Sequence, residues 1–225
     1  MFRLPAKNPW YGHGVKRALD IILALLALIL LSPLLVLITV LLVIFLPGRP
    51  VFRQERVGYK CRIFRIYKFR TMTEAVGEDG KLLPDEARTP WLGRLLRSTS
   101  LDELPELINI LCGDMSFIGP RPWVPTQMET FSAITQQVRM SVRPGLSGLS
   151  QISGRNNLTF RERASLDLRY IRHLCLSLDV VIFLLTFWKV IKREGIYPHP
   201  ENNQHLPPKD PDTKGLRANS TRRCS

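Results

Sequence analysis

Hydrophobic residues form one long block near the start of the chain and shorter, interrupted stretches after it. From residue 18 to 46 the sequence is almost entirely Leu, Ile, Val and Ala, and its polar or helix-breaking members are Asp20, Ser32, Pro33 and Thr39. As a straight helix this block would measure about 42 Å, against a hydrocarbon core of roughly 30 Å. A signal peptide has a shorter apolar region, of about 7–15 residues, before a small-residue cleavage site. The block therefore predicts a helix embedded in a membrane.

The Ser32-Pro33 pair near the middle of the block predicts how this helix enters the membrane. Proline removes a backbone donor and clashes with the preceding turn, so a kink is expected there. Each half is then near 21 Å, too short to cross a bilayer alone. Basic residues precede and follow the block: Arg3, Lys7, Lys16 and Arg17 on one side, and Arg49, Arg53, Arg56, Lys60, Arg62 and Arg65 on the other. Because basic flanks favour the cytoplasmic face, we expect a re-entrant helix, with a simple spanning helix as the alternative.

The rest of the chain predicts an α/β fold in which helix predominates. Two runs of Val, Ile, Phe and Tyr in residues 51–72 flank a turn near Gly58, which is typical of a small β-hairpin. Apolar residues at helical spacing predict helices over 91–97, 104–111, 125–140 and 160–173. We expect a basic flank (1–17), a membrane helix (18–46), a cytoplasmic catalytic domain (47–195) and a disordered tail (196–225).

A second apolar stretch, residues 174–191, could be mistaken for a spanning helix. Asp179 lies within it and Lys189 near its end. Because a charge in the middle of a bilayer is costly, we expect an amphipathic helix that lies at the membrane interface or packs on the domain.

Charge narrows the class of partner. The chain of 225 residues has 32 Lys and Arg against 19 Asp and Glu, a formal net charge of +13. Such a balance predicts an anionic partner, which could be nucleic acid, lipid headgroups or a phosphorylated substrate. No nucleic-acid recognition motif accompanies the membrane segment, so no nucleic-acid partner is expected. The four cysteines lack zinc-ligand spacing, and no structural metal is expected.

Two adjacent carboxylates, Asp102 and Glu103, begin a predicted helix and have two explanations. Ser100 and Glu103 have the spacing of a capping box, and Pro105 suits a first helical turn. The same helix start, with Arg97 nearby, would also favour an ionised Asp102 able to act as a nucleophile. Both explanations stay open on these residues alone.

Two loops, one rigid and one rich in glycine, are candidate phosphate-binding sites. In Gly119-Pro120-Arg121-Pro122 the two prolines restrict the backbone around Arg121, which lowers the entropy cost of fixing its guanidinium. The loop from Arg143 to Arg155 contains three glycines, at 145, 148 and 154, whose backbone could approach a phosphate closely. A rigid turn and a plain flexible connection are the structural alternatives.

Together these motifs resemble a known family, the small monotopic phosphoglycosyl transferases, also called bacterial sugar transferases. The resemblance covers residues 16–195 in order. It is carried by Lys16-Arg17-x-x-Asp20, Ser32-Pro33, Lys68-Phe69-Arg70-Thr71-Met72, Thr99-Ser100-Leu101-Asp102-Glu103-Leu104-Pro105, Gly113-Asp114-Met115-Ser116, Gly119-Pro120-Arg121-Pro122 and Arg143-Pro144-Gly145 through Gly154-Arg155. The chain departs from the family pattern at Glu106, where Gln is usual, and at Leu149, where Trp is frequent.

The resemblance implies a role for each matching residue. Asp102 matches the family's nucleophile and Glu103 its acidic partner, and both are candidate metal ligands. Asp167 matches a further acidic position. The candidates for substrate phosphate contacts are Lys68, Arg97, Arg121 and Arg155.

The resemblance also implies a reaction and its partners. The expected donor is a UDP-sugar, the acceptor is undecaprenyl phosphate, and the cofactor is Mg²⁺, with Mn²⁺ as a substitute. An aspartyl-phosphosugar intermediate and release of UMP are expected at the bacterial inner membrane, with the domain in the cytoplasm among membrane lipids. The sugar and the glycan pathway stay open, as does a homo-oligomer. The alternative function is a non-enzymatic basic adaptor that binds anionic lipid.

Overall fold

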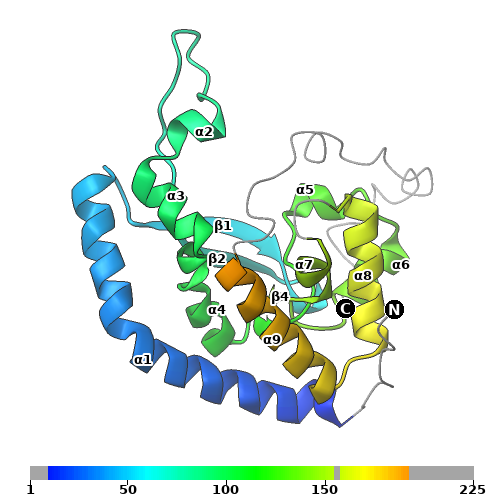
Figure 1. The fold of residues 1–225 in the computed structure, drawn as a ribbon. Coiled ribbons are helices and arrows are strands. Elements are labelled where there is room, and N and C mark those ends of the chain that lie inside the picture. Colours follow the sequence, from blue (N-terminus) through cyan, green and yellow to red (C-terminus); the bar gives the residue numbers. More distant parts are fainter. Residues whose placement is uncertain (1–9, 155–157, 193–225) are drawn as a thin grey trace.

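A computed structural model of the protein describes residues 10–154 and 158–192 (Figure 1). These residues are mostly helical, as the sequence predicts, and they form two small sheets where the sequence predicts one hairpin. The elements are η1 (Tyr11–Val15), α1 (Lys16–Phe45), β1 (Val51–Val57), η2 (Tyr59–Cys61), β2 (Ile63–Phe69), α2 (Asp85–Arg88), α3 (Trp91–Ser98), η3 (Leu101–Glu103), α4 (Glu106–Cys112), β3 (Ser116–Ile118), α5 (Pro125–Met128), α6 (Ala133–Arg139), β4 (Gly145–Ser147), α7 (Leu149–Ser153), α8 (Phe160–Arg172) and α9 (Leu176–Lys192).

Helix α1 is continuous through the predicted kink and bends around the domain. Pro33 lies inside it, and the Ser32 hydroxyl donates a hydrogen bond to the Ile29 carbonyl at 2.8 Å. Figure 1 shows α1 passing beneath the domain and then turning to run up one side. A proline inside a helix is a known cause of such a bend. Entry and exit through one membrane face stay a prediction.

The outer face of α1 is apolar and exposed, whereas its inner face is packed. Ala24, Ile38 and Leu42 are buried against side chains of the hairpin, α3 and α4. The exposed apolar residues of α1 include Ile22, Leu26, Ile29, Leu30, Val36, Val43 and Ile44. The helix is long and apolar enough to cross a membrane. An unbroken exposed apolar face of this kind marks a membrane or partner contact.

The predicted hairpin is confirmed, and a second sheet joins two loops that the sequence left separate. Strands β1 and β2 pair antiparallel, with Val51 opposite Phe69 and Val57 opposite Ile63. Strands β3 and β4 pair in parallel over three residues each, which brings Gly119 against Gly145. A Cβ atom on Gly145 would lie 2.1 Å from the Gly119 nitrogen, so this close approach requires glycine.

Two of the predicted helices differ in detail from the helices of the structure. The single helix expected over 125–140 is two short helices, α5 and α6, because the Ser132 hydroxyl accepts from the Thr135 amide and starts a new helix. The helix expected over 104–111 is α4, and a 3₁₀ turn, η3, precedes it. The predicted tail lies outside the described residues.

The Lys16-Arg17-x-x-Asp20 motif ties the start of α1 to the domain. The Lys16 ammonium pairs with the buried Asp179 of α9. Arg17 donates to the Ile110 and Leu111 carbonyls at the end of α4, at 2.6 and 2.9 Å. Asp20 accepts from the Phe117 amide and the Ser116 hydroxyl, both at 3.1 Å. The motif therefore fixes α1 to α4, β3 and α9.

Helix α9 matches the predicted second apolar segment. Its Asp179 is buried and also accepts from the Tyr11 and Tyr170 hydroxyls, each at 2.7 Å. Its opposite side is exposed and apolar, with Val180, Phe183, Leu184, Phe187, Trp188 and Ile191 uncovered. The position of this face at a membrane interface stays a prediction.

Candidate active site

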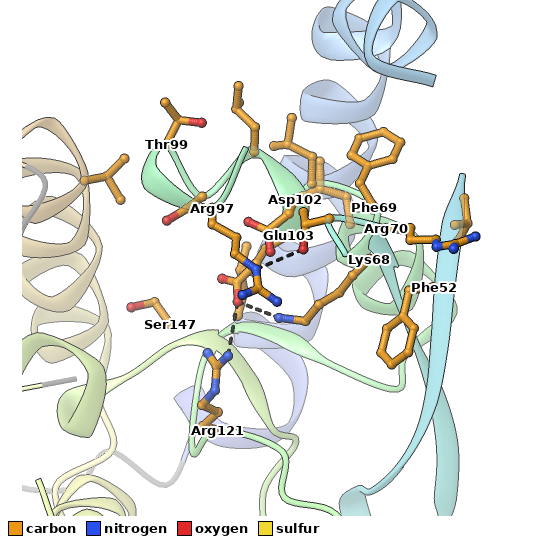
Figure 2. A pocket seen from close by; sticks show the side chains of 18 of the residues that line it. Phe52, Lys68, Phe69, Arg70, Arg97, Thr99, Asp102, Glu103, Arg121 and Ser147 are labelled. Atoms are coloured by element: carbon orange, nitrogen blue, oxygen red, sulfur yellow. Dashed lines mark hydrogen bonds and ion pairs between the residues drawn. The ribbon is translucent and has the colours of Figure 1, made fainter. Parts of the chain in front are cut away.

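A cavity of about 1640 Å³ opens among α1, the hairpin, η3, the loop after β3, α7 and α9. Charged residues line one part of it: Lys68, Arg97, Asp102, Glu103 and Arg121 (Figure 2). Apolar residues line another part: Ala27 and Leu31 from α1 and Phe183, Phe187 and Val190 from α9. The cavity can therefore receive a molecule that carries both charge and hydrocarbon.

Asp102 presents an unpaired carboxylate to this cavity. It sits on η3, which follows Ser100 in the left-handed backbone region at φ 57°. Within residues 10–154 and 158–192, its carboxylate makes no hydrogen bond or ion pair. Burial raises the pKa of Asp102 to about 6, and the Glu103 charge adds to this rise against the opposing effects of Lys68, Arg97 and Arg121. An unpaired carboxylate that is ionised at neutral pH has the state a nucleophile needs.

Glu103, the next residue, is held by two cations. Its Oε1 lies 2.6 Å from the Lys68 ammonium and 3.2 Å from the Arg121 guanidinium. Burial alone would raise the pKa of Glu103, but Lys68 and Arg121 outweigh it and lower that pKa to about 2. Glu103 is therefore a fixed anion, and the two adjacent carboxylates differ in charge environment.

Glu106 is a third carboxylate of this cluster, and the sequence analysis did not predict it as a site residue. Its Oε1 lies 3.1 Å from the Lys68 ammonium, and its side chain is 3% exposed. Burial raises the pKa of Glu106 to about 7, Lys68 opposes the rise and Glu103 adds to it. The spacing of three residues from Glu103 could have suggested it, because such residues share a helix face.

Arg97 is fixed beside the two carboxylates. Its Nε donates to the Thr71 hydroxyl at 2.9 Å, and its Nη2 lies 2.8 Å from the Met72 sulfur. In Figure 2 its guanidinium lies near Asp102, and its charge lowers the pKa of Asp102. The Lys68 to Met72 motif thus supplies Lys68 and Arg70 to the cavity lining, and its Thr71 and Met72 support Arg97.

Arg121 is held by its own loop and by two further arginines. The Arg121 carbonyl accepts from Arg139 Nη2 at 2.9 Å, and the Pro122 carbonyl accepts from Arg56 Nη1 at 3.0 Å. Arg56 also lines the cavity, and burial, with a smaller effect of Arg121, lowers its pKa to about 10. Arg56 was not predicted as a site residue, because the sequence placed it only among the basic residues that follow the apolar block.

Asp167 lies apart from the cavity in a buried ion pair. Its Oδ2 is 2.6 Å from Arg139 Nη2, and its Oδ1 accepts from the Ser150 hydroxyl at 2.9 Å. Arg139 also stacks on Trp123, with its guanidinium carbon 3.7 Å from the ring centroid. In the structure Asp167 therefore fixes Arg139 and, through it, the Arg121 loop. The predicted phosphate contact Arg155 lies outside the described residues.

The carboxylates fit a divalent metal only as a partial site. Among the residues that the structure describes, no group of three or more His, Cys, Asp or Glu could hold a metal. Mg²⁺ is usually bound through one or two carboxylates together with substrate phosphates and water. The unpaired carboxylate of Asp102 suits that arrangement, as does Glu103, whose two cations both contact Oε1.

Comparisons with known proteins give a consistent result. The sequence pattern of the family described as "Bacterial sugar transferase" matches residues 11–193. The chain is 40% identical over 183 residues to "Uncharacterized sugar transferase EpsL" of Bacillus subtilis, covering 81% of this chain and 90% of that protein. It is 37% identical over 203 residues to "Exopolysaccharide production protein ExoY" of Sinorhizobium fredii, covering 83% of this chain and 89% of that protein.

A longer relative has a more specific name. The chain is 37% identical over 194 residues to "UDP-glucose:undecaprenyl-phosphate glucose-1-phosphate transferase" of Escherichia coli. That alignment covers 81% of this chain and 41% of the relative, so the similarity concerns only part of the longer protein.

Proposed function

The chain belongs to the bacterial sugar transferase family, and on that premise we propose that it transfers a sugar-1-phosphate from a UDP-sugar to undecaprenyl phosphate and releases UMP. The observation that carries the proposal is the unpaired Asp102 carboxylate, which faces a cavity beside Lys68, Arg97 and Arg121. The apolar wall formed by α1 and α9 suits a substrate with a hydrocarbon chain.

The proposed chemistry proceeds in two displacements. An Asp102 carboxylate oxygen attacks the phosphorus that bears the sugar, and the bond from this phosphorus to the bridging oxygen breaks. UMP leaves with that oxygen, and a sugar phosphate remains on Asp102 as an acyl phosphate. A phosphate oxygen of undecaprenyl phosphate then attacks the same phosphorus. The bond from this phosphorus to the Asp102 oxygen breaks, the Asp102 carboxylate is restored, and the lipid-linked diphosphosugar forms.

The surrounding residues stabilise the charge in these steps. Lys68, Arg97 and Arg121 stand where they can contact phosphate oxygens, and Glu103 orients Lys68 and Arg121 by its ion pairs. Asp102 and Glu103 would hold Mg²⁺, or Mn²⁺ in its place, together with the phosphates. When bound, this metal neutralises charge on the diphosphate.

The exposed apolar faces of α1 and α9 give the membrane orientation that we propose. A re-entrant α1 at the inner membrane would keep the charged end of the cavity in the cytoplasm, where UDP-sugars are made. The apolar wall would then adjoin the lipid that holds the acceptor chain. A homo-oligomer is compatible with this arrangement.

The test measures UMP release by protein in lipid nanodiscs with undecaprenyl phosphate, Mg²⁺ and a panel of UDP-sugars. We expect release with one donor or a few, and its loss by more than a thousandfold in Asp102→Asn. Chelation of the metal with EDTA should also stop it, and added Mg²⁺ should restore it. Release that survives in Asp102→Asn would contradict the covalent mechanism. Absence of release with every donor, together with binding to anionic vesicles, would favour the adaptor function.

A further inference from the structure

Lys68 is shared between two carboxylates on the wall of the cavity. Its ammonium lies 2.6 Å from Glu103 Oε1 and 3.1 Å from Glu106 Oε1. Lys68 lines the cavity, whereas Glu106, at the start of α4, stands behind it and does not. Glu106 is therefore placed to act on a substrate through cations of the cavity wall, and Lys68 is the one that it contacts.

The contact between Lys68 and Glu106 is an ion pair without hydrogen-bond geometry. Glu106 Oε1 is buried and accepts no hydrogen bond from the residues that the structure describes, although it is within ion-pair distance of Lys68. The charged groups that act on Glu106 are Lys68 of β2, Glu103 of η3, Arg121 of the loop after β3 and, more weakly, Arg56 of β1. Among the described residues, Lys68 is the only cation within ion-pair distance of Glu106.

A diphosphate in the cavity would need the same ammonium. With Glu103 and Glu106 both ionised, one Lys68 charge is divided between two carboxylates before any ligand arrives. Charges a few ångströms apart in a buried site interact strongly because the effective dielectric constant there is lower than in water. Neutralising Glu106 while its shape is kept would therefore leave Lys68 more available to phosphate.

We propose that Glu106 is a positioning residue that holds the Lys68 ammonium against η3 and α4 and competes with the donor diphosphate for its charge. This inference rests on the proposed function, since it assumes that a nucleoside diphosphate occupies the cavity. It means that Glu106 limits the affinity for the donor, which also eases release of the nucleotide product.

The test is the binding of UDP, an unreactive diphosphate, to the full chain in nanodiscs at pH 8 and low ionic strength, with Mg²⁺ fixed. Isothermal titration should give Glu106→Gln an affinity for UDP about three- to tenfold higher than wild type. Uridine, which carries no phosphate, should bind with the same affinity to wild type and to Glu106→Gln. The gain for UDP should shrink in 0.5 M salt.

Glu55→Gln is the matched control, because it makes the same change of charge on β1. Glu55 is exposed, lies outside the cavity lining and pairs only distantly with Arg65, at 3.8 Å. It should leave the UDP affinity unchanged. An equal gain in Glu55→Gln would mean that net charge is responsible, and this would overturn the proposal.

The affinity of the variants for UDP can also overturn the inference or the proposed function. A folded Glu106→Gln that binds UDP no tighter than wild type would overturn the inference and leave the proposed function intact. If this variant does not fold, Glu106→Asp serves instead. It keeps the charge and should bind UDP within about twofold of wild type, so a tenfold gain there would overturn the proposal. Wild-type protein that binds no UDP would contradict the proposed function itself.

Discussion

Asp102 and Glu103 are neighbours in sequence, yet the structure gives them different electrostatic environments. Glu103 has two cations on one oxygen, which lower its pKa to about 2 despite its burial. Asp102 has none within ion-pair distance, and its burial together with the Glu103 charge raises its pKa to about 6. Two carboxylates with separated pKa values can take separate roles. Here Glu103 orients cations and Asp102 stays available for reaction.

These environments predict how UMP release depends on pH. Because the pKa of Asp102 is raised to about 6, protonation removes the proposed nucleophile as the pH falls through that value. The single-turnover rate of UMP release should be about tenfold lower at pH 5 than at pH 7. A metal that binds ionised Asp102 favours the charged form, so more Mg²⁺ should move the midpoint to lower pH. A rate that is flat from pH 5 to 7, in protein whose melting temperature is unchanged, would contradict this assignment.

The sequence pointed to five residues that line the cavity, but it did not point to the neighbouring charged residues that contact them. Asp102, Glu103, Lys68, Arg97 and Arg121 do meet around one cavity. Glu106 and Arg56 were missed because their importance depends on the packing of α4 and the Arg121 loop against the hairpin. Burial and distance of that kind are set by tertiary contacts, which single-sequence patterns do not encode.

At the scale of elements, polar side chains join segments far apart in the chain. The hairpin, the long helix α1 and the apolar α9 followed from runs of apolar residues, although α1 (Lys16–Phe45) begins two residues before the predicted block. The parallel β3–β4 pair did not, since each strand has only three residues and their partners are not adjacent in sequence. The ion pair of Asp167 could not be predicted from the sequence either, because its partner Arg139 lies on another helix. Long-range contacts of this sort position the Arg121 loop.

The Asp167–Arg139 pair predicts a coupled effect on stability. Both side chains are 1% exposed, so removal of one leaves the other as an unpaired buried charge. Breaking such a pair costs about 3–5 kcal/mol, whereas replacing both partners costs less than the two single changes added. Asp167→Ala should therefore lower the melting temperature in nanodiscs by several degrees. Adding Arg139→Met to it should lower that temperature no further.

The exposed Asp79→Ala is the control for this cycle, since Asp79 lies on a solvent-exposed turn, where it accepts from the Lys81 amide at 3.0 Å and lies 3.8 Å from the Lys81 ammonium. It should leave the melting temperature unchanged. Strictly additive effects of the two buried substitutions would show that Asp167 and Arg139 are not coupled. If Asp167→Ala abolished UMP release at an unchanged melting temperature, Asp167 would have a direct part in the reaction.

At the scale of the whole molecule, the cavity brings charged and apolar surfaces together. Its charged residues come from the hairpin, α3, η3 and the Arg121 loop, and its apolar residues include those of α1 and α9, whose outer faces are exposed. The polar motif at the start of α1 attaches this helix to α4, β3 and α9. The membrane helix is therefore built into the wall of the cavity, and its orientation decides which compartment the charged residues face.

That orientation can be tested by labelling from outside the cell. A re-entrant α1 places both of its flanks in the cytoplasm, whereas a spanning α1 places one flank outside. In a variant without native cysteines, Lys7→Cys and Lys81→Cys should both resist a membrane-impermeant maleimide in intact spheroplasts. Both should react once the membrane is opened, which controls for accessibility. Labelling of Lys7→Cys alone in intact spheroplasts would mean that α1 spans the bilayer. The bend at Pro33 would then be a feature of packing against the domain, and the cavity would need another route to its lipid substrate.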